Sequence, residues 1–247
     1  MPDDEVTRRL LHAQGLFDLS AFAHRAIFEG TAFAWDALPH IEAYILHQGA
    51  GSRTPDNQAD VHPAAVIEGA VSIGGGTRVE PGAYIRGPVI IGAGCQIRQG
   101  AYIRGNVILG DRCVVGHATE LKNSILLDDA QAPHFAYVGD SVVGNRVNLG
   151  AGTRLANFPL QGTPAEHGTR RPSIRLLIDG IDIDTRVGKL GAILGDDVQM
   201  GCNVVTSPGC IIGPRTVVYP LVALKKGFYR PDRIIKLRQH IEDVARE

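Results

Sequence analysis

The sequence lacks most features of nucleic-acid binders, membrane proteins and disulfide-rich proteins. Its 25 basic and 26 acidic residues leave a formal net charge of −1, so the basic surface of a nucleic-acid binder is missing. No run approaches the roughly 18 apolar residues of a membrane span, and the start MPDDEVTRRL is not a signal peptide. The cysteines at 95, 113, 202 and 210 are too few and too irregularly spaced for a disulfide scaffold or a zinc knuckle. We therefore expect a cytoplasmic protein with free thiols that binds neither nucleic acid nor membrane.

Aromatic residues are also scarce, at 6%, whereas apolar residues make up an ordinary 44% and glycine is abundant, at 30 of 247 residues. The usual glycine share of roughly 7% would give about 17. Such an excess suggests repeats. From Val61 to Leu127, every sixth residue is aliphatic, and the residue four positions later is small or β-branched up to Gln131. Residues 79–96 and 97–114 share ten identities, so three hexads make one turn.

This period predicts an all-β solenoid, specifically a left-handed parallel β-helix of hexapeptide repeats with roughly seven coils. Each coil would contain three short strands, with the aliphatic residue pointing inward and glycine at the corners. A helical interpretation fails because a period of six, interrupted by glycine and proline, cannot form a stripe of period 3.6.

The period is interrupted twice. The spacing from Leu127 to Val143 predicts an insertion of about four residues around AQAPHFAYVGD. Residues 156–187 form a longer insertion, in which RLLID and IDID around Gly180 predict a β-hairpin. Because solenoids place function in insertions, we expect the chemistry at these two breaks.

The two ends of the chain lack the hexad and predict short helical caps over the ends of the solenoid. We divide the chain into an N-terminal helical cap and linker (1–58), a β-helix acyltransferase domain (59–225) and a C-terminal helix (226–247). Pro231 suits a first helical turn, and residues 234, 237, 241 and 244 mark one apolar face of that helix.

Residues 116–157 contain the motifs H-x-x-Y-x-G-D and V-N-[IL]-G-A-G-T, with an asparagine four residues after the last threonine. The matching positions are His134, Tyr137, Gly139, Asp140, residues 147–153 and Asn157. The stretch resembles the acetyltransferase domain of the bifunctional N-acetylglucosamine-1-phosphate uridyltransferase/glucosamine-1-phosphate acetyltransferase family, and of its archaeal sugar-1-phosphate nucleotidyltransferase relatives. The resemblance covers about residues 60–225. Residues 1–60 are too short to hold that family's nucleotidyltransferase domain.

The resemblance implies a homotrimer that uses acetyl-CoA, with active sites between subunits. His134 falls on the catalytic base, and Ala151 falls where a backbone N–H faces the reacting carbonyl. The acceptor residues would be Arg104 and Lys122 at the phosphate, Tyr137 and Asn148 at the amino sugar, and Lys189 from a neighbouring chain. Asn157 falls near the acetyl-CoA site, and Cys202 stands where the bacterial family has a serine near the thioester.

Reasoning from the residues themselves points the same way. Acetyl transfer to an amine needs a base such as histidine and a donor for the oxyanion. Arg104 and Lys122 are three hexads apart and would stack on one face as a sugar-phosphate clamp. Arg86 occupies the same place as Arg104 in the repeated YIRG, so the alternative is that one of the two arginines is only a surface charge. Lys225 and Lys226 would contact the phosphates of coenzyme A or form a solvated edge.

We expect no metal, because the reaction needs none and the solenoid histidines at 62, 117 and 134 lack the close pair of a gamma-type carbonic anhydrase. The sequence thus predicts an acetyl-CoA-dependent N-acetyltransferase acting on an amino-sugar 1-phosphate resembling glucosamine 1-phosphate. The alternative is a non-catalytic trimeric solenoid, an oligomerisation or ligand-sensing module for a separate sugar nucleotidyltransferase.

Overall fold

The computed structural model describes residues 2–49, 58–160, 172–239, 241–244 and 246. Residues 50–57 of the predicted linker at 49–58, and residues 161–171 of the predicted insertion at 156–187, lie outside the described residues. None of the described helices is long and apolar enough to cross a membrane.

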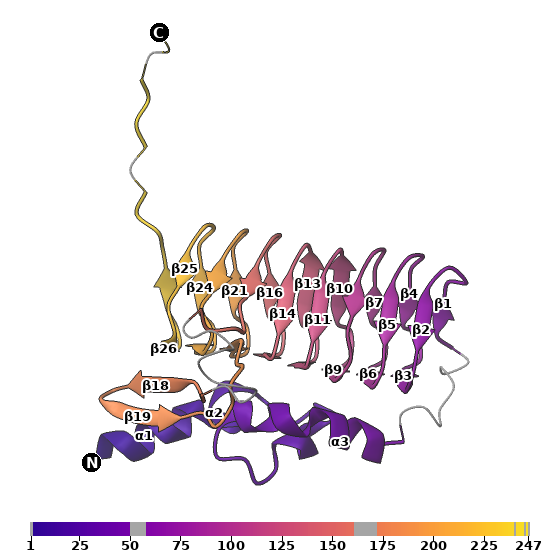
Figure 1. Cartoon of the computed structure of the whole chain (residues 1–247), viewed down its shortest axis with the longest axis horizontal. Helices are drawn as coiled ribbons and strands as arrows, with labels where there is room; N and C mark the ends of the chain where they lie inside the picture. The colour runs from indigo at the N-terminus through magenta and orange to yellow at the C-terminus, as the bar shows by residue number, and fades with distance from the viewer. Residues whose placement is uncertain (1, 50–57, 161–171, 240, 245, 247) are drawn as a thin grey trace.

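Most of the described chain forms a parallel β-solenoid with three faces (Figure 1). We name the faces sheets A, B and C. Sheet A contains β1 (Asp60–Val61), β4 (Arg78–Val79), β7 (Gln96–Ile97), β10 (Val114–His117), β13 (Gln131–His134), β16 (Asn148–Leu149), β21 (Gln199–Met200), β24 (Val217–Val218) and β27 (Ile234–Ile235). Sheet B contains β2 (Val66–Glu68), β5 (Tyr84–Arg86), β8 (Tyr102–Ile103), β11 (Glu120–Lys122), β14 (Tyr137–Gly139), β17 (Arg154–Leu155), β22 (Val205–Thr206) and β25 (Ala223–Leu224). Sheet C contains β3 (Val71–Ile73), β6 (Val89–Ile91), β9 (Val107–Leu109), β12 (Ser124–Leu126), β15 (Val142–Val143), β20 (Ala192–Leu194), β23 (Cys210–Ile212) and β26 (Gly227–Tyr229).

The register of the sheets follows the hexad period. In sheet B, Ile67 pairs with Ile85 and Ile85 with Ile103, so each coil advances by three hexads. Ile85, Ile103 and the other inward aliphatic residues are fully buried in the lumen. The predicted β-helix of hexapeptide repeats is confirmed. It is longer than the seven coils expected, because sheet A has nine strands.

The first break in the period is a shortening of two coils, not an insertion. In sheet C, Leu109 pairs with Leu126 and Leu126 with Val143, so each of these coils is one residue shorter than three hexads. Leu126 points into the lumen, whereas Leu127 packs in a second core outside it. The predicted four-residue insertion was therefore wrong: the chain loses one residue at the corner that follows β11 and another at the corner that follows β14.

The second break is a true insertion between β17 and β20. Val143 pairs with Leu194, which places β20 directly beside β15 although the insertion separates them in sequence. The predicted hairpin is confirmed: β18 (Arg175–Ile178) pairs antiparallel with β19 (Ile181–Asp184) around the turn at Asp179 and Gly180.

The sequence predicts that the N-terminal helices cap an end of the solenoid, and this prediction was wrong. They lie along sheet C (Figure 1). They are α1 (Pro2–Leu11), α2 (Ala13–Leu16), η1 (Arg25–Phe28), η2 (Ala34–His40) and α3 (Ile41–His47). The outward side chains of sheet C are apolar, and helices and hairpin bury them in the second core, which contains Ile90, Ile108, Ile125, Val142, Ile193 and Ile211. The N-terminal segment and the hairpin therefore cover this flank because it is apolar.

Polar contacts hold this cover in place near the last coils. The hydroxyl of Thr7 in α1 donates to Asp179 Oδ2 at the hairpin turn, at 2.7 Å. Arg230, which follows β26, donates to the same oxygen at 2.8 Å. Asp179 thus joins the first helix, the hairpin and the end of the solenoid.

The predicted C-terminal helix was wrong. β26 pairs with β23 and β27 pairs with β24, so the solenoid continues to Ile235, which packs against the lumen core. No helix follows in the described residues 236–239, 241–244 and 246. The apolar spacing suited a helix, but the strand partners of the preceding coil are the stronger local determinant.

Candidate functional site

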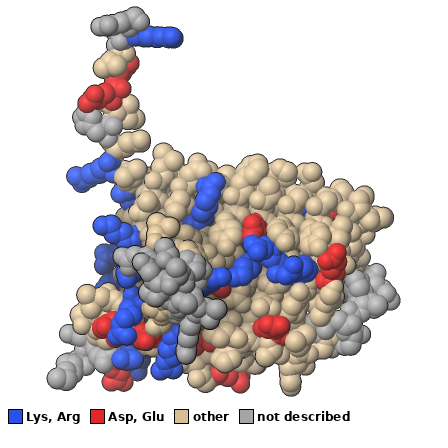
Figure 2. Space-filling model, in the orientation of Figure 1, with Lys and Arg blue, Asp and Glu red and all other residues tan. Residues whose placement is uncertain are grey.

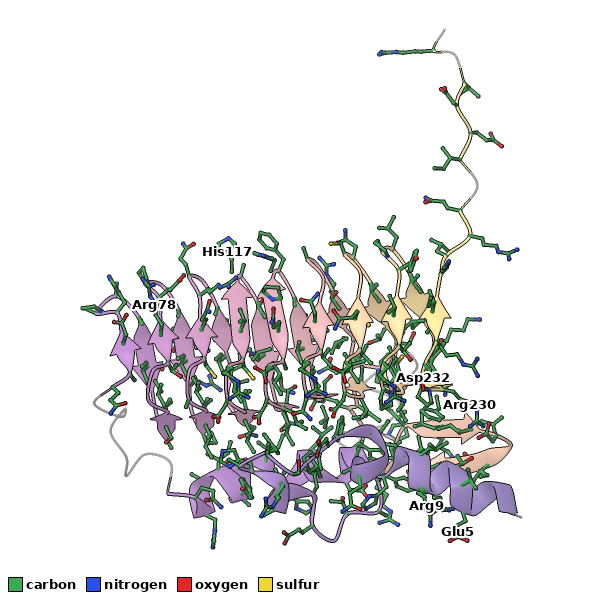
Figure 3. The ribbon with its side chains drawn as sticks, turned by 180° about the vertical axis from the view of Figure 1, so that it is seen from behind. Glu5, Arg9, Arg78, His117, Arg230 and Asp232 are labelled. Carbon is green, nitrogen blue, oxygen red and sulfur yellow. The ribbon has the colours of Figure 1, made fainter. Side chains whose placement is uncertain are left out.

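The corner between sheets A and B carries His134, Ala151 and Cys202 on consecutive coils. The N–H of Gly152 donates to the carbonyl of His134 at 3.1 Å, and the N–H of Asn203 donates to the carbonyl of Ala151 at 2.8 Å. The His134 side chain is exposed, and its backbone pairs with that of His117 on the preceding coil. Figure 3 shows His117 at the edge of the β-helix opposite the N-terminal helices. The predicted base, the predicted oxyanion donor and Cys202 therefore share one exposed ridge.

Local backbone geometry explains why the chain turns here. Phe135 and Gly152 adopt positive φ values of 52° and 74°, which fold the backbone sharply between the two sheets. Gly116 allows the coils to approach, because a Cβ at this position would lie 1.6 Å from the carbonyl oxygen of Pro133. The N–H of Ala151 has no hydrogen-bond acceptor within the described part of the chain.

The outer face of sheet B presents aromatic and charged side chains in register. Tyr102 pairs with Glu120, and Glu120 pairs with Tyr137 on the next coil. Arg104 Nη1 donates to Glu120 Oε1 at 2.5 Å, and its guanidinium lies 5.7 Å from the ring centre of Tyr102. The hydrogen bond to Glu120 raises the pKa of Arg104. Figure 2 shows basic side chains in a band across this part of the β-helix.

Glu120 was not among the site residues predicted from the sequence. An available signal was its position three hexads after Tyr102 and two residues before Lys122, which places it on the same face as both. As the hydrogen-bond partner of Arg104, Glu120 fixes the orientation of the predicted phosphate ligand.

A polar cluster lies at the corner between sheets B and C. Its centre is the buried carboxylate of Asp140. Lys122 Nζ lies 3.3 Å from Asp140 Oδ2, Asn123 Nδ2 donates to Asp140 Oδ1 at 2.8 Å, and Asn157 Nδ2 donates to Asp140 Oδ2 at 2.5 Å. We name these four residues the Asp140 cluster.

The Asp140 cluster borders Tyr137. A Cβ at Gly139 would lie 2.6 Å from the Tyr137 hydroxyl and 2.7 Å from Asn157 Nδ2, so glycine leaves room for both. Burial raises the pKa of Tyr137, and the charge of Glu120 adds to this shift. Asn157, predicted at the acetyl-CoA site, therefore lies with the predicted acceptor residues.

The long insertion returns to the solenoid at the same corner. The N–H of Leu190 donates to the Asn157 carbonyl at 3.2 Å, and the N–H of Gly191 donates to the Asp140 carbonyl at 2.7 Å. The exposed Lys189 therefore emerges beside the Asp140 cluster of its own chain.

Three predicted site residues, Asn148, Lys225 and Lys226, lie apart from the Asp140 cluster. Asn148 begins β16 on sheet A, a different face from that of Tyr137. Lys225 follows β25 at the far end of sheet B and is exposed. Lys226 Nζ donates to the carbonyl of Arg175 in the hairpin at 3.2 Å, so the two lysines have different surroundings. Among the described residues, no group of three or more His, Cys, Asp or Glu side chains is arranged to hold a metal ion.

Known proteins similar to this chain include enzymes with two activities. The bifunctional sugar-1-phosphate nucleotidylyltransferase/acetyltransferase of Sulfurisphaera tokodaii is 36% identical to this chain over 93 residues. This segment is 38% of this chain and 21% of that protein. The bifunctional protein GlmU of Methanococcus vannielii is 34% identical to this chain over 90 residues, which are 36% of this chain and 19% of that protein. The match thus spans about a fifth of the length of these relatives. The polysialic acid O-acetyltransferase OatWY aligns at 16% identity over 77% of this chain and 92% of that chain, with a TM-score of 0.28.

The predicted similarity to bifunctional sugar-1-phosphate enzymes is confirmed by these relatives. It is restricted to the β-helix. The family model of the GMPPB C-terminal domain matches residues 85–236, more than half of the chain, and the chain belongs to this family.

Proposed function

We propose that this chain transfers an acetyl group from acetyl-CoA to the amino group of an amino-sugar 1-phosphate similar to glucosamine 1-phosphate. The observation that carries the proposal is the arrangement around one corner. His134 and Ala151 stack on successive coils of this corner, and the adjoining sheet B presents Tyr137. The names of the relatives, which include acetyltransferase activity and a sugar 1-phosphate, support this choice of reaction.

The chemistry follows from the groups at the corner. The amine of the acceptor, after losing the proton of its ammonium form to solvent, attacks the thioester carbonyl carbon and forms a C–N bond. His134 takes the second proton from the attacking nitrogen, and the N–H of Ala151 donates to the oxyanion. The C–S bond then breaks, and the leaving thiolate takes the proton from His134 to become coenzyme A, which returns His134 to its neutral form.

Sheet B and the Asp140 cluster would hold the acceptor. Arg104 and Lys122 carry the cations suited to its phosphate, and both are oriented by carboxylates, Glu120 and Asp140 respectively. Tyr137 would contact the sugar. We assign Asn157 to the acceptor side as well, because it is bound to Asp140. Cys202 and Lys225 lie on later coils, where the acyl donor would extend away from the acceptor.

A homotrimer would complete the site. Asn148 and Tyr137 lie on different faces of one β-helix, so a second copy packed against the corner would bring an Asn148 toward the acceptor, whereas Lys189 already lies beside the Asp140 cluster of its own chain. Sheets A and B are free to form such contacts, because the N-terminal segment covers sheet C.

The test is a thiol-release assay with acetyl-CoA and a panel of amino-sugar 1-phosphates, combined with calorimetric titration of coenzyme A. We expect turnover with at least one acceptor and binding of coenzyme A. If coenzyme A does not bind and no acceptor is acetylated, the enzyme proposal fails and the non-catalytic solenoid is the correct description.

A further inference from the structure

The face of sheet B that leads away from the Asp140 cluster carries a second copy of the Tyr-x-Arg pattern. Tyr84 pairs in register with Tyr102, so Arg86 lies one coil before Arg104. The outward positions on three successive coils are therefore Arg86, Arg104 and Lys122. The proposed phosphate clamp uses only the last two.

The charge balance along this row is uneven. Lys122 is bound to Asp140, and Arg104 is bound to Glu120. Arg86 is exposed and has no carboxylate within ion-pair distance in the described part of the chain. Its register partner is Glu68, which instead accepts a hydrogen bond from the Tyr84 hydroxyl at 2.7 Å. The coil of Arg86 thus keeps a guanidinium able to bind an anion.

Two aromatic rings accompany this cation. The rings of Tyr84 and Tyr102 are 5.4 Å apart at an angle of 77°, an edge-to-face contact in which they do not stack on each other. The hydrogen bond to Glu68 fixes the Tyr84 ring. Tyr84 is half-buried and Tyr102 is exposed, and accessible aromatic rings beside an arginine are the groups that stack with a nucleobase and bind the phosphates attached to it.

We propose that Tyr84, Arg86 and Tyr102 form a nucleotide subsite, so that the acceptor is an amino sugar linked to a nucleoside diphosphate. This inference rests on the proposed function, because such an acceptor keeps the anomeric phosphate at Arg104 and Lys122. Successive coils are about 4.8 Å apart, and the second phosphate follows the first through one bridging oxygen. The second phosphate therefore reaches Arg86, and the base reaches the two tyrosines. A simple sugar 1-phosphate would leave this subsite empty.

The experiment compares glucosamine 1-phosphate with UDP-glucosamine as acceptors, at saturating acetyl-CoA, for the full chain and its variants. We expect kcat/KM to be at least about tenfold higher for the nucleotide-linked acceptor. Arg86→Gln should raise KM for this acceptor about tenfold, as for the loss of a hydrogen bond to a charged group, and leave glucosamine 1-phosphate unaffected. Tyr84→Ala should act in the same direction, and Tyr84→Phe should retain most of the affinity because it keeps the ring.

The matched control is Arg78→Gln, because Arg78 is an exposed arginine of sheet A paired with Asp60 (Figure 3). This substitution should change the KM of neither acceptor. Equal or better use of glucosamine 1-phosphate, or an equal effect of Arg86→Gln on both acceptors, overturns the nucleotide subsite and leaves the proposed function intact. If neither acceptor is acetylated, the proposed function fails, and calorimetry with uridine and guanosine diphosphates decides the subsite. Binding that is lost in Arg86→Gln supports the subsite, and no binding overturns it.

Discussion

The carboxylate of Asp196 accepts a hydrogen bond at 2.8 Å from the backbone N–H of Asp18, 178 residues earlier in the chain. It also accepts from the backbone N–H of Asn145 at 2.8 Å, as Asp128 does from Asp111 at 2.9 Å two coils earlier. Buried side chains at this corner, between sheets C and A, thus bind the N–H of the preceding coil, and Asp196 extends the pattern to the N-terminal segment. The covering segment is therefore attached by a directional contact as well as by apolar burial.

Ile108→Ala should measure how strongly that cover stabilises the fold. Ile108 points out of sheet C and is fully buried under the N-terminal segment. Its truncation should lower the free energy of unfolding by about 2–5 kcal/mol. Denaturant unfolding checks this, with Ile234→Ala as the control because Ile234 is 63% exposed. Equal effects of the two variants would contradict the buried flank.

The corner between sheets C and A also carries exposed ion pairs that should make the fold sensitive to acid. Arg146 Nε lies 2.7 Å from Asp197 Oδ1, and Arg215 Nε lies 2.6 Å from Asp232 Oδ1. Hydrogen bonds from these arginines lower the pKa of Asp197 and of Asp232. Because the folded-state pKa is lowered, the stabilisation is present above the ordinary value of about 3.9 and is lost as pH falls through the lowered value.

The check is thermal unfolding as a function of pH. Tm should fall below about pH 4, and Asp197→Asn should make that fall shallower. At neutral pH the variant should lose about 0.2–1 kcal/mol, as expected for an exposed pair. If Tm falls with pH as steeply in Asp197→Asn as in the unsubstituted protein, Arg146 does not stabilise the Asp197 carboxylate.

His134→Ala should remove the base of the proposed reaction. Loss of general-base catalysis typically costs about 10² to 10⁴ in rate, so kcat should fall by that factor while coenzyme A still binds. His62→Ala is the matched control, because His62 is an exposed histidine at the same type of corner on the first coil. Full activity of His134→Ala, measured by thiol release, would refute the assignment.

Asp140→Asn should loosen the acceptor site without breaking the corner. Asp140 has a φ of 48°, which asparagine tolerates. The substitution removes the charge that orients Lys122, so KM for the acceptor should rise about tenfold or more with a smaller change in kcat. Asp182→Asn, on the exposed hairpin, is the control. Unchanged acceptor kinetics would show that the Asp140 cluster is only structural.

Much of the fold could be predicted from the sequence because each hexad places one aliphatic residue in the lumen. The period became ambiguous where Leu126 and Leu127 are both apolar, and the shortened coils were therefore missed. A signal for the covered flank was present in strands such as Val107–Leu109, where three consecutive apolar residues replace the alternation of a half-exposed strand. The segment that covers the flank has no periodic signal of its own.

The candidate site was predictable where a residue lies on the motif, as with His134 and Tyr137. The contacts between coils were less so. The ion pair of Glu120 with Arg104 depends on side-chain orientation across neighbouring coils, which the spacing of three hexads per coil permits but does not determine. The place of Asn157 beside Asp140 depends on how the chain leaves the solenoid for the long insertion.

The route of the N-terminal segment also affects how the molecule unfolds. In a simple solenoid each coil contacts only its neighbours, so the structure can fray from either end. Here α1 is bound to the hairpin turn near the last coils, and α3 lies against β9 near the first coils. Loss of one coil would therefore disturb a segment that also holds distant coils, and the β-helix should unfold as one cooperative unit.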